Sequence, residues 1–303
     1  MRWCLLLLFA LTGFAAGQIG AQDAAVKDAA ANDTDTKEGE DYLRLSTADN
    51  NPNKLVAMQT AIVRYRGKPG SKYDGQVVDL VGVVHIGEAE YYKDLDDRLS
   101  KYDVVLYELV APDGTRFKPE DLKNRRSVLS SMQSGMKSML NLEYQLEKID
   151  YMRDNFRHAD MSPDEFAKDM ERRGDSIWKM IARMMGAGLA AQGSGGGSDA
   201  GLLVAMFSGN RSKMMKQTMA RQLVNMELVT AGMDDEQGEN TIIKGRNVKA
   251  FGVLREELDK GKESIAVFYG AGHLMDMAER LETDFEMVEE ETTWLNAWDL
   301  SRN

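Results

Sequence analysis

The 303-residue chain has almost no cysteine: its only thiol is Cys4, which precedes an apolar stretch at the N-terminus. One cysteine excludes an intrachain disulfide, and its position is unsuitable for the lipid-bearing cysteine of a lipoprotein. Removal of an N-terminal leader would also remove this thiol, which excludes thiolate chemistry from the mature chain. A packed core must therefore stabilise the fold, and a chain of this length can bury one.

Positive charge is also scarce, because 38 Lys and Arg residues face 49 Asp and Glu residues, for a net charge of -11. Nucleic acids and anionic lipid surfaces attract basic proteins, so an acidic chain is a poor candidate for either partner. We therefore expect no nucleic-acid partner. The sequence leaves the oligomeric state open.

The apolar run at the N-terminus, from Leu5 to about Ala16, is too short to span a bilayer comfortably. It follows Arg2 and precedes small residues, a layout typical of a secretory signal peptide. We predict a signal peptide at residues 1–21, cleaved after Gly17 or Ala21; an uncleaved anchor is the alternative. The protein is then exported to the periplasm, the cell envelope or the medium, with no transmembrane span in the mature chain.

Residues 22–53 are rich in Ala, Asp, Asn, Thr and Lys and poor in large apolar side chains, which predicts a disordered tether. A single α/β domain is predicted at residues 54–303. Its first part has the pattern of strands, then a helix, then another strand, a βαβ unit that implies parallel strands. The predicted elements are strands Leu55–Arg64 and Gln76–Val84, helix Glu88–Leu99 and strand Val104–Val110.

The C-terminal part repeats the strand, turn and helix plan. Its predicted elements are helix Asn240–Lys260, strand Ser264–Tyr269, turn Gly270–His273, helix Leu274–Leu281 and one or two strands in Phe285–Trp298. Two strand-GxxH-helix repeats indicate a divergent internal duplication. The predicted fold class is therefore α/β, with a mixed central sheet built from these two repeats.

A large Met-rich helical insertion is predicted between the repeats, at about residues 119–238, and it holds 15 of the 20 methionines. These methionines either fill the core of a helical subdomain or form an adaptable groove for a peptide or small hydrophobic ligand. The Gly-rich stretch Gly193–Ser198 is predicted to be a flexible break, because it lacks the spacing of a dinucleotide loop.

Two of the three histidines, His85 and His273, follow a glycine by three positions and end a buried-looking strand. In parallel sheets, ligands bind beyond the carboxyl ends of the strands, where both histidines are expected. The third, His158, lies among charged residues and is predicted to be a solvated residue at a helix end.

The paired histidines predict a divalent metal site, because neutral imidazole is a good ligand for zinc, manganese or cobalt. Glycines at Gly82, Gly270 and Gly272 would allow the tight turns and the close approach of an ion or substrate. The alternative is that both histidines only cap helices.

Glu108 stands in an otherwise apolar strand, where a buried carboxylate must be paired, hydrogen-bonded or metal-bound. With His85 and His273 it would form a two-histidine, one-carboxylate set that leaves room for water or substrate. An edge-strand glutamate facing solvent is the alternative. Arg246, in the helix before the second repeat, could stabilise developing negative charge or hold a substrate carboxylate.

The segments VGVVHIGEAEYYKDLDDRLSKYDVVLYELV, GRNVKAF and VFYGAGHLMDMAERL together resemble the TraB/GumN (Tiki-like) superfamily. The resemblance implies an α/β fold with an internal repeat and a site made of His85, Glu108, Arg246 and His273. It also implies kinship with Tiki proteins, which are metal-dependent proteases, with erythromycin-esterase-like hydrolases and with haem-binding proteins of iron uptake. The chain departs from the family pattern at Val84, at Gly245 and at Met275–Asp276, which bears on the substrate more than on the site.

Three functional hypotheses follow. The first is an exported metal-dependent hydrolase, a peptidase, with His85, Glu108 and His273 as metal ligands and with Glu108 and Arg246 as catalytic groups. The second is a non-catalytic binding protein that sequesters a peptide, haem or a hydrophobic ligand. The third is a structural protein of the envelope.

Overall fold

The computed structural model describes residues 42–117, 140, 142–174, 211–231 and 240–302. The signal peptide predicted at 1–21, the first part of the predicted tether and the Gly-rich break at Gly193–Ser198 lie outside the described residues.

The described part of the chain has the predicted α/β fold, with a mixed sheet of seven strands in the order β1-β2-β3-β8-β5-β7 and β9 paired with β2. The parallel half contains β3, β8, β5 and β7, and the strands around β2 are antiparallel. The strands of this sheet are β1 (Leu43–Ala48), β2 (Asn51–Gly67), β3 (Val77–Val83), β5 (Val104–Tyr107), β7 (Phe156–His158), β8 (Ser264–Gly270) and β9 (Met287–Asp299). A separate two-stranded ladder pairs β4 (Ile86–Gly87) with β6 (Glu143–Tyr144).

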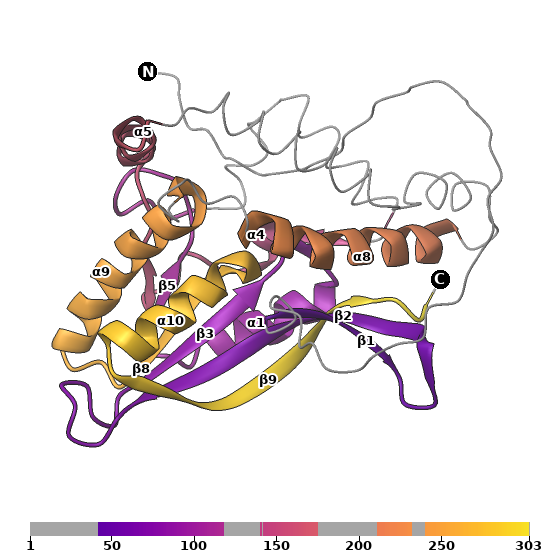
Figure 1. The fold of residues 1–303 in the computed structure, drawn as a ribbon, viewed down its shortest axis with the longest axis horizontal. Helices are drawn as coiled ribbons and strands as arrows, with labels where there is room; N and C mark the ends of the chain where they lie inside the picture. Colours follow the sequence, from indigo (N-terminus) through magenta and orange to yellow (C-terminus); the bar gives the residue numbers. More distant parts are fainter. Residues whose placement is uncertain (1–41, 118–139, 141, 175–210, 232–239, 303) are drawn as a thin grey trace.

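Helices cover both faces of the sheet (Figure 1). The helical elements are α1 (Ala89–Leu99), α4 (Gln145–Lys148), α5 (Pro163–Arg172), α8 (Arg211–Ala231), the π-helical turn η1 (Thr241–Gly245), α9 (Arg246–Asp259), the 3-10 turn η2 (Ala271–His273) and α10 (Leu274–Asp284). Side chains of α1 and α8 join one apolar core, and side chains of α9 and α10 join the other.

The sequence of the central strands explains why helices lie on both faces. In β3, Val81 and Val83 point into the core beneath α1, whereas Val78 and Leu80 point into the core beneath α9 and α10. Successive side chains of a strand face opposite sides, so a strand covered on both sides is apolar over most of its length.

The two repeats lie side by side, because β3 and β8 are parallel neighbours in which Gly82 pairs with Tyr269 and Val83 with Gly270. The strand predicted after the first repeat, β5, is parallel to both, as expected for a βαβ unit, but β8 lies between it and β3. The two G-x-x-H turns therefore leave the sheet at the same edge.

The predicted tether was wrong at its C-terminal end, since Leu43–Ala48 form β1 and Asn51 already belongs to β2. β1 is an edge strand whose backbone pairs with β2, with Leu43 opposite Thr60. Only Leu43 in this strand is buried, so few apolar residues are needed to order it.

The insertion predicted as helical at about 119–238 is only partly helical where it is described. Helices α4, α5 and α8 lie in it. Helix α5 begins at Pro163 after the N-cap residue Ser162, which forms a capping box with Glu165. However, Phe156–His158 is strand β7 of the main sheet, parallel to β5.

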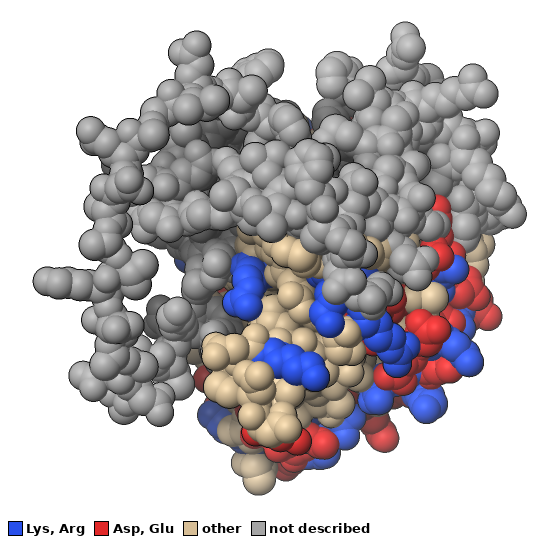
Figure 2. Space-filling view, turned by 90° about the vertical axis from the view of Figure 1, so that its right-hand side faces the viewer, with Lys and Arg blue, Asp and Glu red and all other residues tan. Residues whose placement is uncertain are grey.

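Two other boundaries differ from those predicted: the strand predicted at Val104–Val110 ends at Tyr107, and the helix predicted from Asn240 begins as the π-helical turn η1. The closing stretch, predicted to hold one or two strands, forms one long strand, β9. Charged side chains of both signs are interspersed on one flank of the described surface (Figure 2).

Candidate functional site

The carboxyl ends of four adjacent parallel strands carry the polar residues of the candidate site. The strands lie in the order β3, β8, β5 and β7, and each is followed within a few residues by one polar residue of the site. These are His85 after β3, His273 after β8, Glu108 after β5 and Asp160 after β7. This is the edge where open α/β sheets bind ligands.

Arg246 joins this cluster from the N-terminus of α9, and its side chain is only 10% exposed. Its Nε donates to Asp160 Oδ1 at 2.9 Å, and its Nη2 donates to Asp160 Oδ2 and to Glu108 Oε1, each at 2.6 Å. Burial alone would lower the pKa of Arg246, but Asp160 and Glu108 raise the pKa well above its usual value. The guanidinium is therefore a permanent buried cation between two carboxylates.

Glu108 is the first residue beyond β5, and its Oε2 accepts the backbone N–H of Gly270 at 2.8 Å. Burial raises the pKa of Glu108, but Arg246, the nearby imidazoles of His273 and His85 and the Gly270 amide outweigh burial and hold the pKa well below its usual range. Glu108 is thus an ionised, paired carboxylate, and the alternative of a solvent-facing glutamate is wrong.

His273 ends η2, and its ring is buried beside Tyr269. Its Nδ1 lies 2.7 Å from Asn247 Oδ1, and its Nε2 lies 3.7 Å from Glu108 Oε1 and 3.5 Å from Arg246 Nη1. Burial is the main cause that lowers the pKa of His273, to about 4, so the ring is neutral at pH 7. A neutral imidazole can bind a metal ion or accept a proton.

His85 lies at the rim of the cluster and is exposed. Its Nδ1 is 3.1 Å from Gln145 Oε1, and its backbone carbonyl accepts the N–H of Gln145 at 3.0 Å. It is near enough to Glu108 and His273 to influence the pKa of both. The structure therefore brings both predicted histidines to one region, one buried and one exposed.

The three predicted glycines have different surroundings. A Cβ at Gly82 would lie 3.1 Å from the Ala61 carbonyl oxygen and from Leu274 Cδ2, so this glycine permits close packing in the core. A Cβ at Gly270 would lie 3.3 Å from Glu108 Oε2, which keeps room beside the site carboxylate. Gly272 is exposed in the turn η2.

Asp160 and Asn247 belong to the cluster although the sequence did not single them out. Asp160 is fully buried, and it follows Ala159, whose carbonyl accepts the hydroxyl of Tyr269. Asn247 is fully buried next to Arg246. A buried Asp must be paired, so a correct assignment of β7 would have indicated Asp160 as a strand-end residue.

His158 is not the solvated helix residue that was predicted. It ends β7, is half-buried, and its Nε2 donates to the carbonyl oxygen of Leu109 at 2.6 Å. This bond holds the loop after β5 against β7, so His158 has a structural contact outside the Arg246 cluster.

The cluster supplies two atoms suited to a divalent ion, His273 Nε2 and Glu108 Oε1. Two ligands with bonds of ~2.1 Å lie about 3.0–3.6 Å apart at ordinary bond angles, close to the observed 3.7 Å. Among the described residues, no three His, Cys, Asp or Glu side chains are grouped closely enough to hold an ion. Of the three predicted metal ligands, His273 and Glu108 therefore lie close enough together to bind one ion, and His85 lies farther from both.

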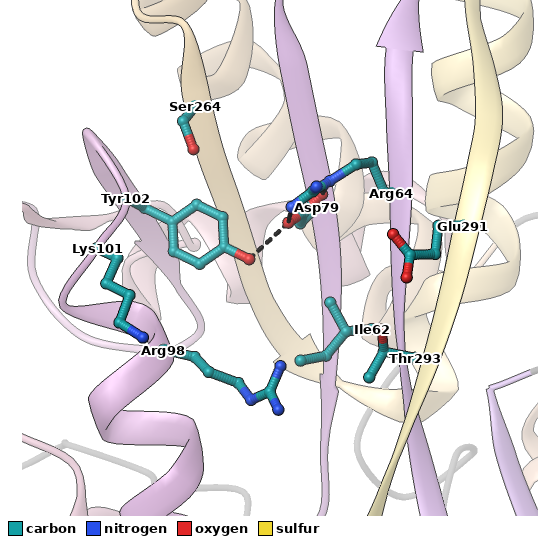
Figure 3. Close-up of a pocket in the computed structure, with 9 residues that line it drawn as sticks. All are labelled: Ile62, Arg64, Asp79, Arg98, Lys101, Tyr102, Ser264, Glu291 and Thr293. Carbon is teal, nitrogen blue, oxygen red and sulfur yellow. Dashed lines mark hydrogen bonds and ion pairs between the residues drawn. The ribbon is translucent and has the colours of Figure 1, made fainter.

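A cavity of about 260 Å³ lies elsewhere, at the amino ends of β3 and β8 (Figure 3). On its wall the buried carboxylate of Asp79 accepts two bonds from Arg64, at 2.9 and 2.8 Å, and one from the hydroxyl of Tyr102, at 2.6 Å. Arg98 and Lys101 of the adjacent helix end also line it. This cavity therefore lies at the opposite ends of the parallel strands from the Arg246 cluster.

Comparison of the chain with protein-family models, with curated proteins and with solved structures gave no match. Within the described ranges, none of the helices combines the length and the apolar character needed to cross a membrane.

Proposed function

We propose that the chain is an exported metal-dependent hydrolase of the TraB/GumN type that cleaves peptide bonds. The observation that carries the proposal is the meeting of His273, Glu108 and Arg246 at the carboxyl ends of parallel strands. Three elements that are far apart in sequence supply these residues, and all three side chains are largely removed from water. Such clusters of perturbed ionisable groups are typical of active sites.

His273 Nε2 and Glu108 Oε1 would hold the ion, and His85 is the candidate for a further ligand from the rim. A bound divalent ion polarises a carbonyl group and lowers the pKa of a water molecule. The chain itself supplies an uncharged imidazole, an ionised carboxylate and a fixed cation within one small region.

Arg246 is the residue suited to stabilise negative charge that develops on a substrate oxygen. Its Nη1 is the guanidinium nitrogen that faces His273, whereas Nε and Nη2 are bound to carboxylates. The two carboxylates hold the guanidinium plane in place, so little reorganisation is needed when charge develops.

The second candidate is a binding protein that sequesters a peptide, haem or a hydrophobic ligand without turnover. The pairing of Arg246 with both Glu108 and Asp160 favours it, because a cation already neutralised by two carboxylates attracts a new negative charge less strongly.

The test is the metal content of the purified mature protein, followed by a peptide-library digestion with zinc, manganese or cobalt. The variants are His85→Ala/His273→Ala and, as a matched control, His158→Gln, which removes a histidine outside the cluster. The proposal expects about one ion per chain and metal-dependent cleavage in the parent and the control, and loss of both in the double variant. Equal metal content in all three proteins would refute it, and stoichiometric ligand binding without cleavage would support the second candidate.

A further inference from the structure

The side chain of Asn247, the second residue of α9, has a fixed orientation. Its Nδ2 donates to the carbonyl oxygen of His273 at 3.1 Å and to Asp276 Oδ2 at 2.8 Å. Arg280 donates to both oxygens of Asp276, at 2.7 and 3.1 Å, which holds that side chain in place as an acceptor. An amide nitrogen only donates, and a flipped amide would set its oxygen against these two acceptors.

The orientation of the amide determines the tautomer of His273. Because Nδ2 is used by the two acceptors, the remaining atom, Oδ1, faces His273 Nδ1 at 2.7 Å. An amide oxygen only accepts, so Nδ1 must carry the proton. In a neutral ring the other nitrogen, Nε2, then has a free lone pair.

Two groups lie beside Nε2: Arg246 Nη1, which can only donate, at 3.5 Å, and Glu108 Oε1, which accepts, at 3.7 Å. Neither distance is as short as the 2.7 Å between Nδ1 and Asn247 Oδ1, so that contact decides the tautomer. With the proton on Nε2 instead, the bare Nδ1 would face the lone pairs of Asn247 Oδ1.

We propose that Asn247 is a positioning residue that holds His273 as the Nδ1–H tautomer and aims the Nε2 lone pair at Glu108 and Arg246. The use of this lone pair as a metal ligand rests on the proposed function, whereas the tautomer itself does not. The partner of a histidine's second nitrogen commonly fixes the orientation of a metal-binding ring, and its loss weakens metal binding about 10- to 100-fold.

Nitrogen NMR of the full mature chain tests the tautomer without metal or substrate, at about pH 8, where neutral histidines predominate. The chain has three histidines, so the variants His85→Gln and His158→Gln assign the His273 signals by elimination. We expect a protonated Nδ1 and an unprotonated Nε2 in the parent. A protonated Nε2 of His273 in the parent would overturn the proposal, whether or not the Asn247 variants fold.

The variants Asn247→Leu and Asn247→Asp test the cause. Leucine removes the acceptor, so both tautomers of His273 should appear; aspartate keeps an acceptor, so the Nδ1–H tautomer should persist. The control is Asn155→Leu, which removes a half-buried amide outside the cluster, one that donates to the carbonyl oxygens of Leu99 and Tyr102 at 3.0 Å each. The control should leave the His273 signals unchanged, and an unchanged tautomer in folded Asn247→Leu would overturn the proposal.

Binding of cobalt(II) alone provides the second readout. We expect Asn247→Leu to bind it about 10- to 100-fold more weakly than Asn155→Leu. If the parent binds none of cobalt, zinc and manganese while its tautomer is as proposed, the proposed function fails and the role of Asn247 in orienting the ring stands. If Asn247→Leu binds cobalt as tightly as Asn155→Leu, the positioning role toward a metal is refuted.

Discussion

Replacement of Arg246 by methionine would remove the cation that contacts both Glu108 and Asp160 while keeping most of the side-chain volume. The exposed fractions of the three side chains are 10% for Arg246, 13% for Glu108 and 0% for Asp160. Water therefore cannot replace the guanidinium without opening the cluster. Removal of one partner from a buried ion pair costs about 3–5 kcal/mol. We expect Arg246→Met to lower the free energy of unfolding by that amount at pH 7, a large fraction of the stability of a typical domain.

The loss should depend on pH, and the sign follows from Glu108. In the parent its pKa lies below the usual value, so its contribution to stability is present at neutral pH and is lost as the pH falls through the acid range. In the variant without Arg246, only weaker effects oppose burial, which raises the pKa of Glu108. Glu108 in the folded variant therefore takes up a proton more readily than in the parent. The difference in stability between parent and variant should therefore narrow as the pH falls from 7 towards about 5.

Urea unfolding followed by circular dichroism measures both quantities. The matched control is Arg98→Met, which breaks the ion pair with Asp94. This pair is exposed, since 41% of the Arg98 side chain and 47% of the Asp94 side chain are accessible to water. Such a pair contributes less than about 1 kcal/mol. In the double variant Arg246→Met/Glu108→Gln, one unpaired charge is gone, so the loss should be smaller than in Arg246→Met. The reasoning is refuted if Arg246→Met loses no more stability than Arg98→Met, or if its loss is the same at both pH values.

Two further predictions concern the scaffold, and urea unfolding tests both. Gly67→Ala would set a Cβ 1.9 Å from the carbonyl oxygen of Tyr73, so it should destabilise the fold by more than about 3 kcal/mol. Gly70→Ala, which has strained backbone at φ +80° but open space, should lose only about 1 kcal/mol; equal losses would contradict the steric reason. Tyr102→Phe removes the hydroxyl that donates to Asp79 Oδ2 at 2.6 Å and should cost about 1.5–3 kcal/mol. A loss below about 0.5 kcal/mol would show that the Tyr102–Asp79 hydrogen bond adds no stability beyond that of the Arg64–Asp79 ion pair.

The central part of the fold could be predicted from the sequence because its signals are local. β3 and β8 are largely apolar, with Gly82 and Gly270 at or next to their last residues, and the turns after them lie where the G-x-x-H spacing indicated. A glutamate inside an apolar stretch must have a partner, and Glu108 indeed has one in Arg246.

The missed elements gave no local signal. β7 has only three residues, too few for a period of two to be distinguished from the helical pattern around it. Because β7 was missed, Asp160 was not recognised as a residue at a strand end. Asn247 was missed for another reason: its partner His273 lies 26 residues later in the chain, and only packing of α9 against η2 brings them together.

The charges of the cluster bear on which ligands it can accept. With neutral His273, the carboxylates of Glu108 and Asp160 (-2) and the guanidinium of Arg246 (+1) sum to -1 among the described residues that meet there. Excess charge in a buried place is costly unless a counter-charge or proton relieves it. An anionic group that approached His273 Nε2 would meet the lone pair of that nitrogen and also the carboxylate oxygen Oε1 of Glu108, which lies 3.7 Å from it. Both would repel the anion. The cluster thus favours a cation, or a neutral amide whose oxygen turns to Arg246, over a substrate carboxylate, which narrows the role first expected of that arginine.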